Sequence, residues 1–249
     1  MRGTMKKISL LLFSFFSFYI HAEPPDIVYR AVMEDPEYVK QSQGFKARGM
    51  TENRPNRPPL NMSLFNHANG GDTGMARYDS GYVSTTTSYN LAHLWVNSNL
   101  GGRGYIYHIQ PTGNMIDVNQ TLRQFSPHSG EMEYAAMGTI HWEQIRGWTE
   151  ISFGVPQPYV VNRDYNSRLY DIAHAGGEVP SLAGFPEDHQ AWSMEPWVEF
   201  SNCNAFKSSS NTNEKCKPDK TAQNIGEEYF YKYNGALLFK ELMPVLFSK

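Results

Sequence analysis

The sequence predicts a mixed α/β fold of the α+β kind, in which short strands and short helices follow one another along the chain. Runs rich in β-branched and aromatic residues recur, as strands require, and stretches with helix-capping residues separate them. The chain has 249 residues, of which 40% are hydrophobic and 19% are charged. This composition is typical of an ordinary globular protein with a sizeable core in one or two domains.

Residues 1–22 are expected to be a secretory signal peptide and not part of the fold. Three basic residues precede the apolar run 8–20, and Ala22 offers a small residue for cleavage. Removing this leader leaves 19 basic residues against 25 acidic ones, which changes the net charge from −3 to −6. An acidic mature chain argues against nucleic acid as a partner.

The first elements expected after the leader are a strand over residues 27–32 and a helix over residues 35–42. Asp35 can cap the helix, and Pro36 suits its first position. Arg30 is a charged residue within an otherwise apolar strand. Such an arginine is either an exposed strand end or an anchor for a phosphate or carboxylate, and the pattern leaves both interpretations open.

A long polar loop is expected over residues 48–59, which contain three prolines and show no hydrophobic period. Loops of this length often act as lids over a binding site. The next helix is expected over residues 61–68. It carries His67, which is either a functional residue or an ordinary histidine at a helix end.

The middle of the chain is expected to supply most of the strands. Residues 81–87 combine β-forming residues with a row of hydroxyl groups, and a helix over residues 91–100 follows. Further strands are expected over residues 105–109, 115–119 and 148–153, and residues 140–148 are expected to form a strand or a turn into one.

Two carboxylates, Glu131 and Glu133, stand two residues apart. On a strand or extended loop, positions i and i+2 point to the same side, so both groups could face one site. Paired carboxylates stabilise a developing oxocarbenium ion and handle a proton in sugar chemistry. An isolated pair is more often a solvated acidic turn, so the pattern alone does not decide between the two interpretations.

Regular structure is expected to give way after residue 154 to a polar, extended bridge over residues 155–181. A small apolar knot follows over residues 182–203. A helix is expected over residues 221–233, and an apolar tail completes the chain.

Cys203 and Cys216 are the two cysteines of the chain, and an even number in an exported protein predicts one disulfide. The loop that they close is rich in small polar residues, which is typical of an exposed, protease-accessible tip. Lys207 within it offers a trypsin-like cleavage site.

Several classes of enzyme are excluded by their missing motifs. The sequence has no P-loop, no CxxC and no HExxH, and the glycine-rich run 101–104 lacks the spacing of a dinucleotide fingerprint. The histidines have no metal-ligand spacing. A Rossmann dehydrogenase and a zinc enzyme are therefore not expected, and no metal is predicted.

Three groups of residues together resemble the catalytic set of arginine-directed mono-ADP-ribosyltransferases: Arg30, the run Ser84-Thr85-Thr86, and Glu131 with Glu133. The resemblance is closest to the A subunits of cholera toxin and the heat-labile enterotoxins, and it spans about residues 27–216. Further matching motifs follow in order: Tyr29-Arg30-Ala31, Asp79 to Thr85, Ala92-His93-Leu94, Tyr105-Ile106-Tyr107, Asn114-Met115, Ser126-Pro127-His128, Gly147-Trp148, Asn162 to Tyr165, Leu182 to Pro186, Trp192 and Pro196-Trp197. One departure is Val32, which stands where the family has an aspartate on the adenine side of NAD.

The resemblance implies the ADP-ribosyltransferase toxin fold, with NAD in a cleft between small sheets, an extended bridge, and a C-terminal helix plus tail. It implies cleavage at Lys207, after which Cys203 and Cys216 form a reducible tether. The implied parts are the signal peptide 1–22, the catalytic part 23–207 with its core 23–154, the cleavage loop 203–216, and the helix and tail 217–249 that dock into a B pentamer.

The resemblance also implies a role for each candidate site residue. Glu133 would bond the ribose of NAD and stabilise its positive charge, while Glu131 would orient the acceptor arginine and take its proton. The residues implied in NAD binding, directly or by positioning Glu133, are Arg30, Ser84, Thr85 and His67.

The implied function is that of a secreted toxin component that passes through the periplasm and acts in the host cytosol. It would transfer ADP-ribose from NAD to an arginine of a host protein. The implied target is a stimulatory G-protein α subunit, with raised host cAMP as the result. The implied partners are a homopentameric B subunit, which binds the tail, and a host ADP-ribosylation factor, which activates the enzyme. Two alternatives stay open: an NAD glycohydrolase, and a catalytically weakened A chain with a binding or structural role.

Overall fold

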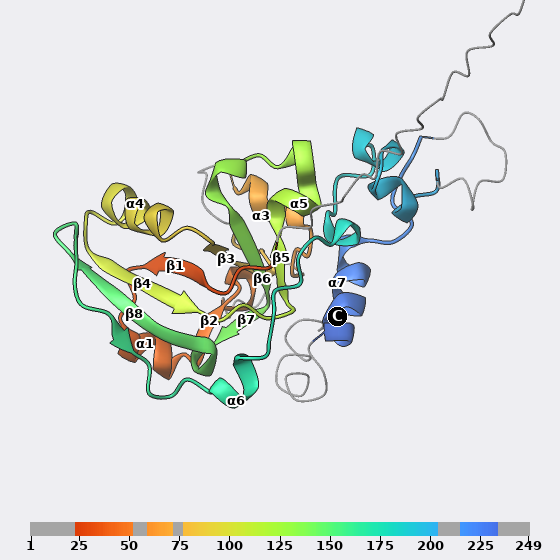
Figure 1. Ribbon diagram of the computed structural model, residues 1–249. Coiled ribbons are helices and arrows are strands. Elements are labelled where there is room, and N and C mark those ends of the chain that lie inside the picture. Colours follow the sequence, from red (N-terminus) through yellow and green to blue (C-terminus); the bar gives the residue numbers. More distant parts are fainter. Residues whose placement is uncertain (1–22, 52–58, 72–76, 204–214, 234–249) are drawn as a thin grey trace, which may run out of the picture.

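The computed structural model describes residues 23–51, 59–71, 77–203 and 215–233, and it confirms the mixed fold of antiparallel sheets and short helices (Figure 1). The strands are β1 (Val28–Val32), β2 (Gly44–Lys46), β3 (Tyr82–Thr86), β4 (Gly104–Ile109), β5 (Met115–Asp117), β6 (Glu133–Met137), β7 (Thr139–His141), β8 (Ile145–Ser152), β9 (Val155–Pro156) and β10 (Val160–Val161). The α-helices are α1 (Pro36–Gln41), α2 (Arg48–Thr51), α3 (Leu64–Asn69), α4 (Tyr89–Asn99), α5 (Val118–Leu122), α6 (Ser167–Tyr170) and α7 (Ala222–Tyr233). The 3₁₀ helices are η1 (Arg123–Phe125), η2 (Ser129–Glu131), η3 (Trp142–Gln144), η4 (Pro180–Leu182), η5 (Gln190–Ser193) and η6 (Trp197–Phe200).

The main sheet runs in the order β10-β8-β4-β1-β3-β6-β5, with β9 also paired to β8, and β2 and β7 form a separate pair. Five residue pairs join β1 to β4, and five join β3 to β6. Between β1 and β3, the described residues pair only at Tyr29 and Thr86. The sheet therefore consists of two halves that meet at a narrow β1–β3 junction, in agreement with the small sheets that the family resemblance implies.

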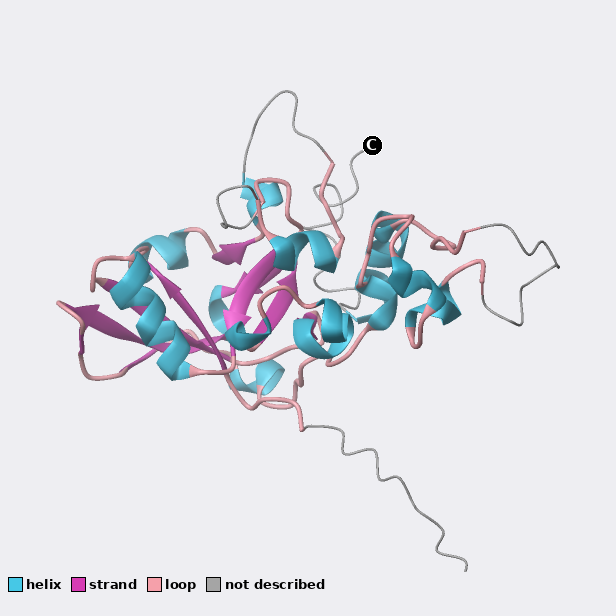
Figure 2. Ribbon diagram, turned by 90° about the horizontal axis from the view of Figure 1, so that it is seen from above, coloured by secondary structure: helices cyan, strands magenta, loops and turns pink. Residues whose placement is uncertain are grey.

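The predicted helices α1 and α4 are both present. Helix α1 has the predicted N-cap, and helix α4 packs on the sheet. Asp35 accepts a hydrogen bond from the backbone N–H of Tyr38 at 2.8 Å, and Pro36 occupies the first turn of α1. Helix α4 lies along one face of the sheet, as the view in Figure 2 shows. Its buried residues Ala92 and Val96 pack against Ile106 and Ile151 of β4 and β8.

The prediction of a loop over residues 48–59 is wrong for its first four residues, because residues 48–51 form helix α2. Gly49 lies against the chain that enters β3, where a Cβ at this position would fall 2.7 Å from the carbonyl oxygen of Asp79. Its backbone N–H also donates to the carbonyl of Ser80 at 2.9 Å. Residues 52–58 lie outside the described residues, so the lid stays a prediction.

Three further predicted boundaries shift for identifiable reasons. Helix α3 begins after Ser63, whose side chain caps the backbone N–H of Asn66 at 3.0 Å. The strand predicted over residues 115–119 ends at Asp117, whose side chain caps α5 through the N–H of Gln120 at 2.9 Å. Residues 140–153 divide into β7, a 3₁₀ turn and the single strand β8. The predicted bridge also adds two short strands, β9 and β10, to the sheet.

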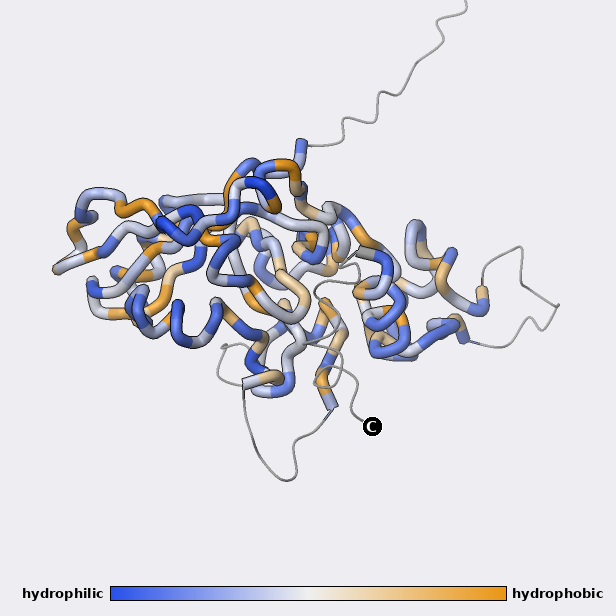
Figure 3. Tube along the Cα trace, turned by 90° about the horizontal axis from the view of Figure 1, so that it is seen from below, coloured by the Kyte–Doolittle hydropathy of each residue, from blue (hydrophilic) through white to orange (hydrophobic). Residues whose placement is uncertain are grey.

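The predicted apolar knot is present and belongs to the main core. Trp192 and Trp197 are fully buried there, in one cluster with side chains of α3, β3, β6 and α7. Hydrophobic and hydrophilic stretches alternate along this part of the chain (Figure 3), as expected where each short turn buries one side and exposes the other. Tyr229 of α7 donates its hydroxyl hydrogen to the carbonyl of Gly113 at 2.7 Å.

The predicted disulfide between Cys203 and Cys216 is confirmed. Lys207, the signal peptide and residues 234–249 lie outside the described residues, so cleavage, export and the tail stay predictions. Within the part of the chain that the structure describes, no helix has the length and apolar character needed to span a bilayer.

Candidate active site

Glu133 is the centre of the candidate site and is the first residue of β6. It pairs with Thr86 of β3, which places its side chain on the same face of the sheet as Ser84. Glu133 is 8% exposed, and its Oε1 lies 2.9 Å from Nε2 of His67. Ser84 also hydrogen-bonds Glu133, and its Oγ lies 3.2 Å from the same histidine nitrogen. The structure thus brings together three of the predicted site residues.

The surroundings of Glu133 favour its ionised form. Burial by itself pushes the pKa of Glu133 upwards. The hydrogen bonds from His67 and Ser84 and the positive charge of Arg30 outweigh burial and hold the pKa of Glu133 below its ordinary value. A buried carboxylate that stays charged can stabilise positive charge on a bound ligand, because little water screens it.

Arg30 stands at the β1–β3 junction and is an internal anchor, not an exposed strand end. Its Nη1 donates to the carbonyl of Ser84 at 2.7 Å, and its guanidinium lies over the ring of Phe45 at 5.2 Å. Burial lowers the pKa of Arg30, and the charges of Glu34 and Glu133 offset part of this effect. Among the described residues, its buried Nε has no hydrogen-bond partner. An unsatisfied arginine donor fits the phosphate of a nucleotide ligand such as NAD.

Glu131 lies close to Glu133 in the chain, but the two residues do not share a strand. The prediction that strand alternation turns both side chains to one face was therefore wrong. Glu131 closes the 3₁₀ turn η2, and Met132 takes a left-handed conformation with φ of 47° before β6 begins. Glu131 is exposed, and its carbonyl accepts a hydrogen bond from Oγ1 of Thr86 at 2.8 Å. Partial burial and the charge of Glu133 raise its pKa, against the opposite influence of nearby histidines. The two carboxylates are therefore chemically different, one buried and held ionised and the other accessible and more basic.

The turn that carries Glu131 is braced by side chains that the sequence did not single out. Asn119 of α5 donates its Nδ2 hydrogen to the carbonyl of Ser129 at 2.7 Å. The hydroxyl of Ser126 donates to Oδ1 of the same asparagine at 2.8 Å. The bond from Asn119 to Ser129 ties η2 to the first turn of α5.

Thr85, the remaining predicted residue of β3, is not brought into this group. It is opposite Tyr134 in the register, on the other face of the sheet from Ser84 and Glu133. Its side chain is buried, and its hydroxyl donates to the carbonyl of Tyr134 at 2.6 Å. Thr85 thus joins β3 to β6, and its hydroxyl is occupied in the sheet.

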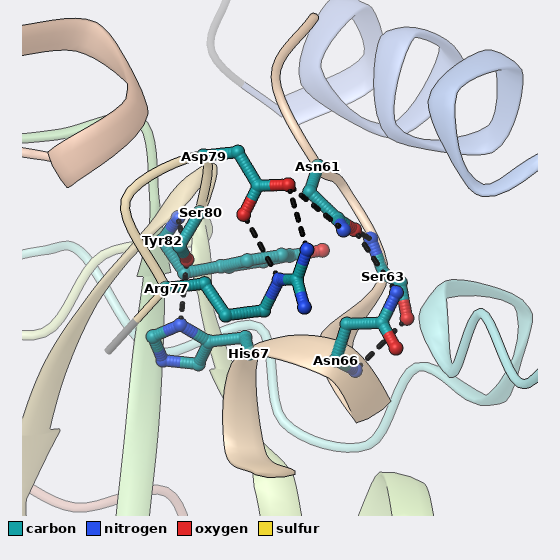
Figure 4. Close-up of polar contacts among 8 residues, drawn as sticks. All are labelled: Asn61, Ser63, Asn66, His67, Arg77, Asp79, Ser80 and Tyr82. Atoms are coloured by element: carbon teal, nitrogen blue, oxygen red, sulfur yellow. Dashed lines mark hydrogen bonds and ion pairs between the residues drawn. The ribbon is translucent and has the colours of Figure 1, made fainter. Parts of the chain in front are cut away.

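Ser80 is a further residue of the site that was not among the candidates predicted from the sequence. Its Oγ lies 2.7 Å from Nδ1 of His67, on the opposite edge of the ring from Glu133, and Figure 4 shows the two side chains facing each other. The available signal was its position within the run Asp79 to Thr85, which carries part of the resemblance.

Comparison with known proteins identifies the family of the chain. The family described as heat-labile enterotoxin alpha chain matches residues 6–249. The chain is 40% identical to the cholera enterotoxin A chain of Vibrio cholerae serotype O1 over 239 residues, which cover 92% of this chain and 90% of that protein. It is 37% identical to a Vibrio cholerae protein named NAD(+)--arginine ADP-ribosyltransferase Chelt, over 79% of this chain and 33% of that protein.

Solved structures give the same result. A double cysteine mutant of heat-labile enterotoxin superposes with a TM-score of 0.69 and 34% identity, covering 89% of this chain and 96% of that chain. A valine-to-lysine mutant of the Escherichia coli toxin gives a TM-score of 0.61 and 40% identity, covering 69% and 96% of the two chains. These sequence and structural matches show that the chain belongs to the heat-labile enterotoxin A-chain family.

Proposed function

We propose that this chain is the catalytic component of a toxin and transfers ADP-ribose from NAD to an arginine of a host protein. The observation that carries the proposal is the pair of unlike carboxylates at the β1–β3 junction, with Glu133 buried and held by His67 and Glu131 exposed. The relative named as an NAD-arginine ADP-ribosyltransferase supports the same reaction class.

NAD is a substrate here, and it supplies an ADP-ribosyl group whose bond to nicotinamide breaks as positive charge develops on the ribose. Glu133 stabilises this charge and accepts a hydrogen bond from the ribose. Arg30 holds a phosphate of NAD through its free Nε donor. Ser84 and His67 act on Glu133 and keep it oriented.

Glu131 serves the acceptor. A guanidinium has a pKa above 12 and is a poor nucleophile until it is oriented and loses a proton. The raised pKa of Glu131 makes it a better base than an ordinary glutamate. As nicotinamide departs, a guanidinium nitrogen bonds to the ribose carbon and its proton passes to Glu131.

A reaction with NAD and agmatine, a soluble arginine analogue, tests this division of roles. The intact protein is expected to release nicotinamide and form ADP-ribosyl-agmatine. In the Glu131→Gln variant, transfer should fall about 100-fold because the base is lost, while slow release of nicotinamide to water continues. Glu150→Gln, which changes an exposed carboxylate on β8, is the matched control and should retain transfer.

Two outcomes of the agmatine reaction would contradict the proposal. If the intact protein releases nicotinamide without forming ADP-ribosyl-agmatine, it is an NAD glycohydrolase. If neither product forms, the chain has a binding or structural role.

The finer parts of the proposal concern the setting of the reaction. We propose that the chain is secreted through the periplasm and acts in the host cytosol. Its target is a stimulatory G-protein α subunit, whose modification raises host cAMP, and a host ADP-ribosylation factor activates it. A reconstituted assay measures transfer of ADP-ribose to the purified G-protein α subunit, with and without the GTP-bound factor. The α subunit should be modified, and the factor should increase the rate.

A homopentameric B subunit is the proposed partner of residues 217–249. Helix α7 already buries Ile225, Tyr229 and Phe230 against the catalytic part, so the B contact is assigned to the residues beyond Tyr233. A chain that ends after Tyr233 should keep agmatine transfer but should no longer co-elute with the B pentamer in size-exclusion chromatography. Co-elution of this truncated chain would show that the contact lies elsewhere.

A further inference from the structure

Ser80 lies just before β3 and is held rigidly from several sides. It is 1% exposed, and it forms an isolated β-bridge with Asn61. Its carbonyl accepts from the N–H of Gly49 at 2.9 Å, and its own N–H donates to the carbonyl of Arg77 at 3.1 Å. Figure 4 shows Arg77 below Ser80 and Asn61 to its right. The position of the Ser80 hydroxyl is therefore fixed before any ligand binds.

The partners of this hydroxyl determine where its single hydrogen points. The backbone N–H of Tyr82 donates to Oγ of Ser80 at 3.2 Å, so that lone pair is occupied. The other close partner is Nδ1 of His67 at 2.7 Å. Across the ring, Nε2 faces Oε1 of Glu133, which only accepts hydrogen bonds when ionised. Every group is satisfied when Nε2 carries the hydrogen and Nδ1 accepts from Ser80.

We propose that Ser80 is a positioning residue that holds His67 in its Nε2–H form and so aims a hydrogen-bond donor at Glu133. The other neutral form of the ring would place a lone pair of Nε2 against the carboxylate, which is repulsive. The ring of His67 also packs against Tyr82 at 5.3 Å between centroids, which limits its rotation. The inference deepens the proposed function and rests on the role given there to Glu133.

The first test removes the hydroxyl. Ser80→Ala should lower kcat for NAD turnover about tenfold, because a buried acceptor loses its donor, with a change of less than about twofold in KM for NAD. Ser80→Thr keeps the hydroxyl and should restore most of the lost rate. Equal losses in both variants would overturn the proposal.

A double-mutant cycle tests whether Ser80 acts through His67. In a His67→Ala background, Ser80→Ala should cause no further loss of kcat, because the group through which it acts is already gone. If the two losses multiply, Ser80 contributes by another route and the proposal is overturned.

Ser201→Ala is the matched control for general damage. Ser201 is fully buried, its Oγ accepts from the N–H of Cys203 at 3.2 Å, and it donates to the carbonyl of Trp192 at 2.9 Å. Its removal should lower the melting temperature as Ser80→Ala does and leave kcat unchanged. A fall in kcat of the same size in this variant would mean that lost packing, not His67, explains the Ser80 effect.

Nitrogen-15 NMR of the histidine side chains gives a readout that does not depend on turnover. In the intact protein, Nε2 of His67 should carry the ring hydrogen and Nδ1 should not. In Ser80→Ala the Nδ1 resonance should move, since it loses its hydrogen bond. A protonated Nδ1 in the intact protein would overturn the inference about Ser80. The proposed function is tested by a different experiment. If Glu133→Gln still turns over NAD at the normal rate, the proposed function fails, whatever the state of His67.

Discussion

Replacement of Glu133 by glutamine is expected to reduce nicotinamide release and ADP-ribosyl transfer on the order of 10³-fold, because the charge that stabilises the ribose is lost from a buried position. Glutamine has the size and shape of glutamate. Its carbonyl oxygen can still accept from His67, so the local hydrogen bond at 2.9 Å can survive the change. The loss should therefore come from electrostatics and not from unfolding.

Glu178→Gln is a suitable control for this variant, since Glu178 forms an ion pair with Arg123 at 2.9 Å outside the site. It should turn over NAD at the normal rate. The measurement is initial-rate nicotinamide release, with thermal unfolding recorded in parallel. An unchanged rate in Glu133→Gln would refute the role given to this carboxylate.

The strands and the longer helices could be predicted because their signals are local. β1 and β3 have strand-forming residues throughout, and α1 carries its own cap. The missed helices α2, α5 and α6 are only four or five residues long, too short for a hydrophobic period to be visible. Such short helices depend on tertiary contacts, as between Gly49 and Ser80, which a linear sequence does not reveal.

The residue types of the site could be predicted from the sequence. The different surroundings of Glu131 and Glu133, and of Ser84 and Thr85, could not. Strand alternation predicted that Glu131 and Glu133 would share one face, whereas a 3₁₀ turn and a left-handed Met132 separate their environments. Thr85 belongs to the same motif as Ser84, yet alternation along β3 turns its hydroxyl to the opposite face. Ser80 lies within the matching run Asp79 to Thr85, but its pairing with His67 is set by folding and could not be predicted from that run.

Arg30→Lys is expected to lower kcat/KM for NAD about 100-fold although the positive charge is kept. Arginine at this place has two tasks. Its Nη1 bonds the carbonyl of Ser84 across the β1–β3 junction, where only Tyr29 and Thr86 pair among the described strand residues, and its Nε remains for a ligand. A lysine ammonium is a point charge on a flexible stem and cannot span both positions. Loss of one charge-assisted hydrogen bond costs about 1.5–3 kcal/mol, which corresponds to this range of rates.

Steady-state kinetics with varied NAD separates the two tasks of Arg30. If the ligand contact dominates, KM rises and kcat changes little, because ground-state and transition-state binding are lost together. If the bond to Ser84 dominates, kcat falls, since Ser84 supports Glu133. Arg103→Lys, which alters an arginine stacked 4.1 Å from the centroid of the Phe153 ring, controls for the substitution itself and should leave both constants unchanged. Normal kcat/KM in Arg30→Lys would mean that charge alone suffices at the junction, and that the orphaned Nε has no part in binding NAD.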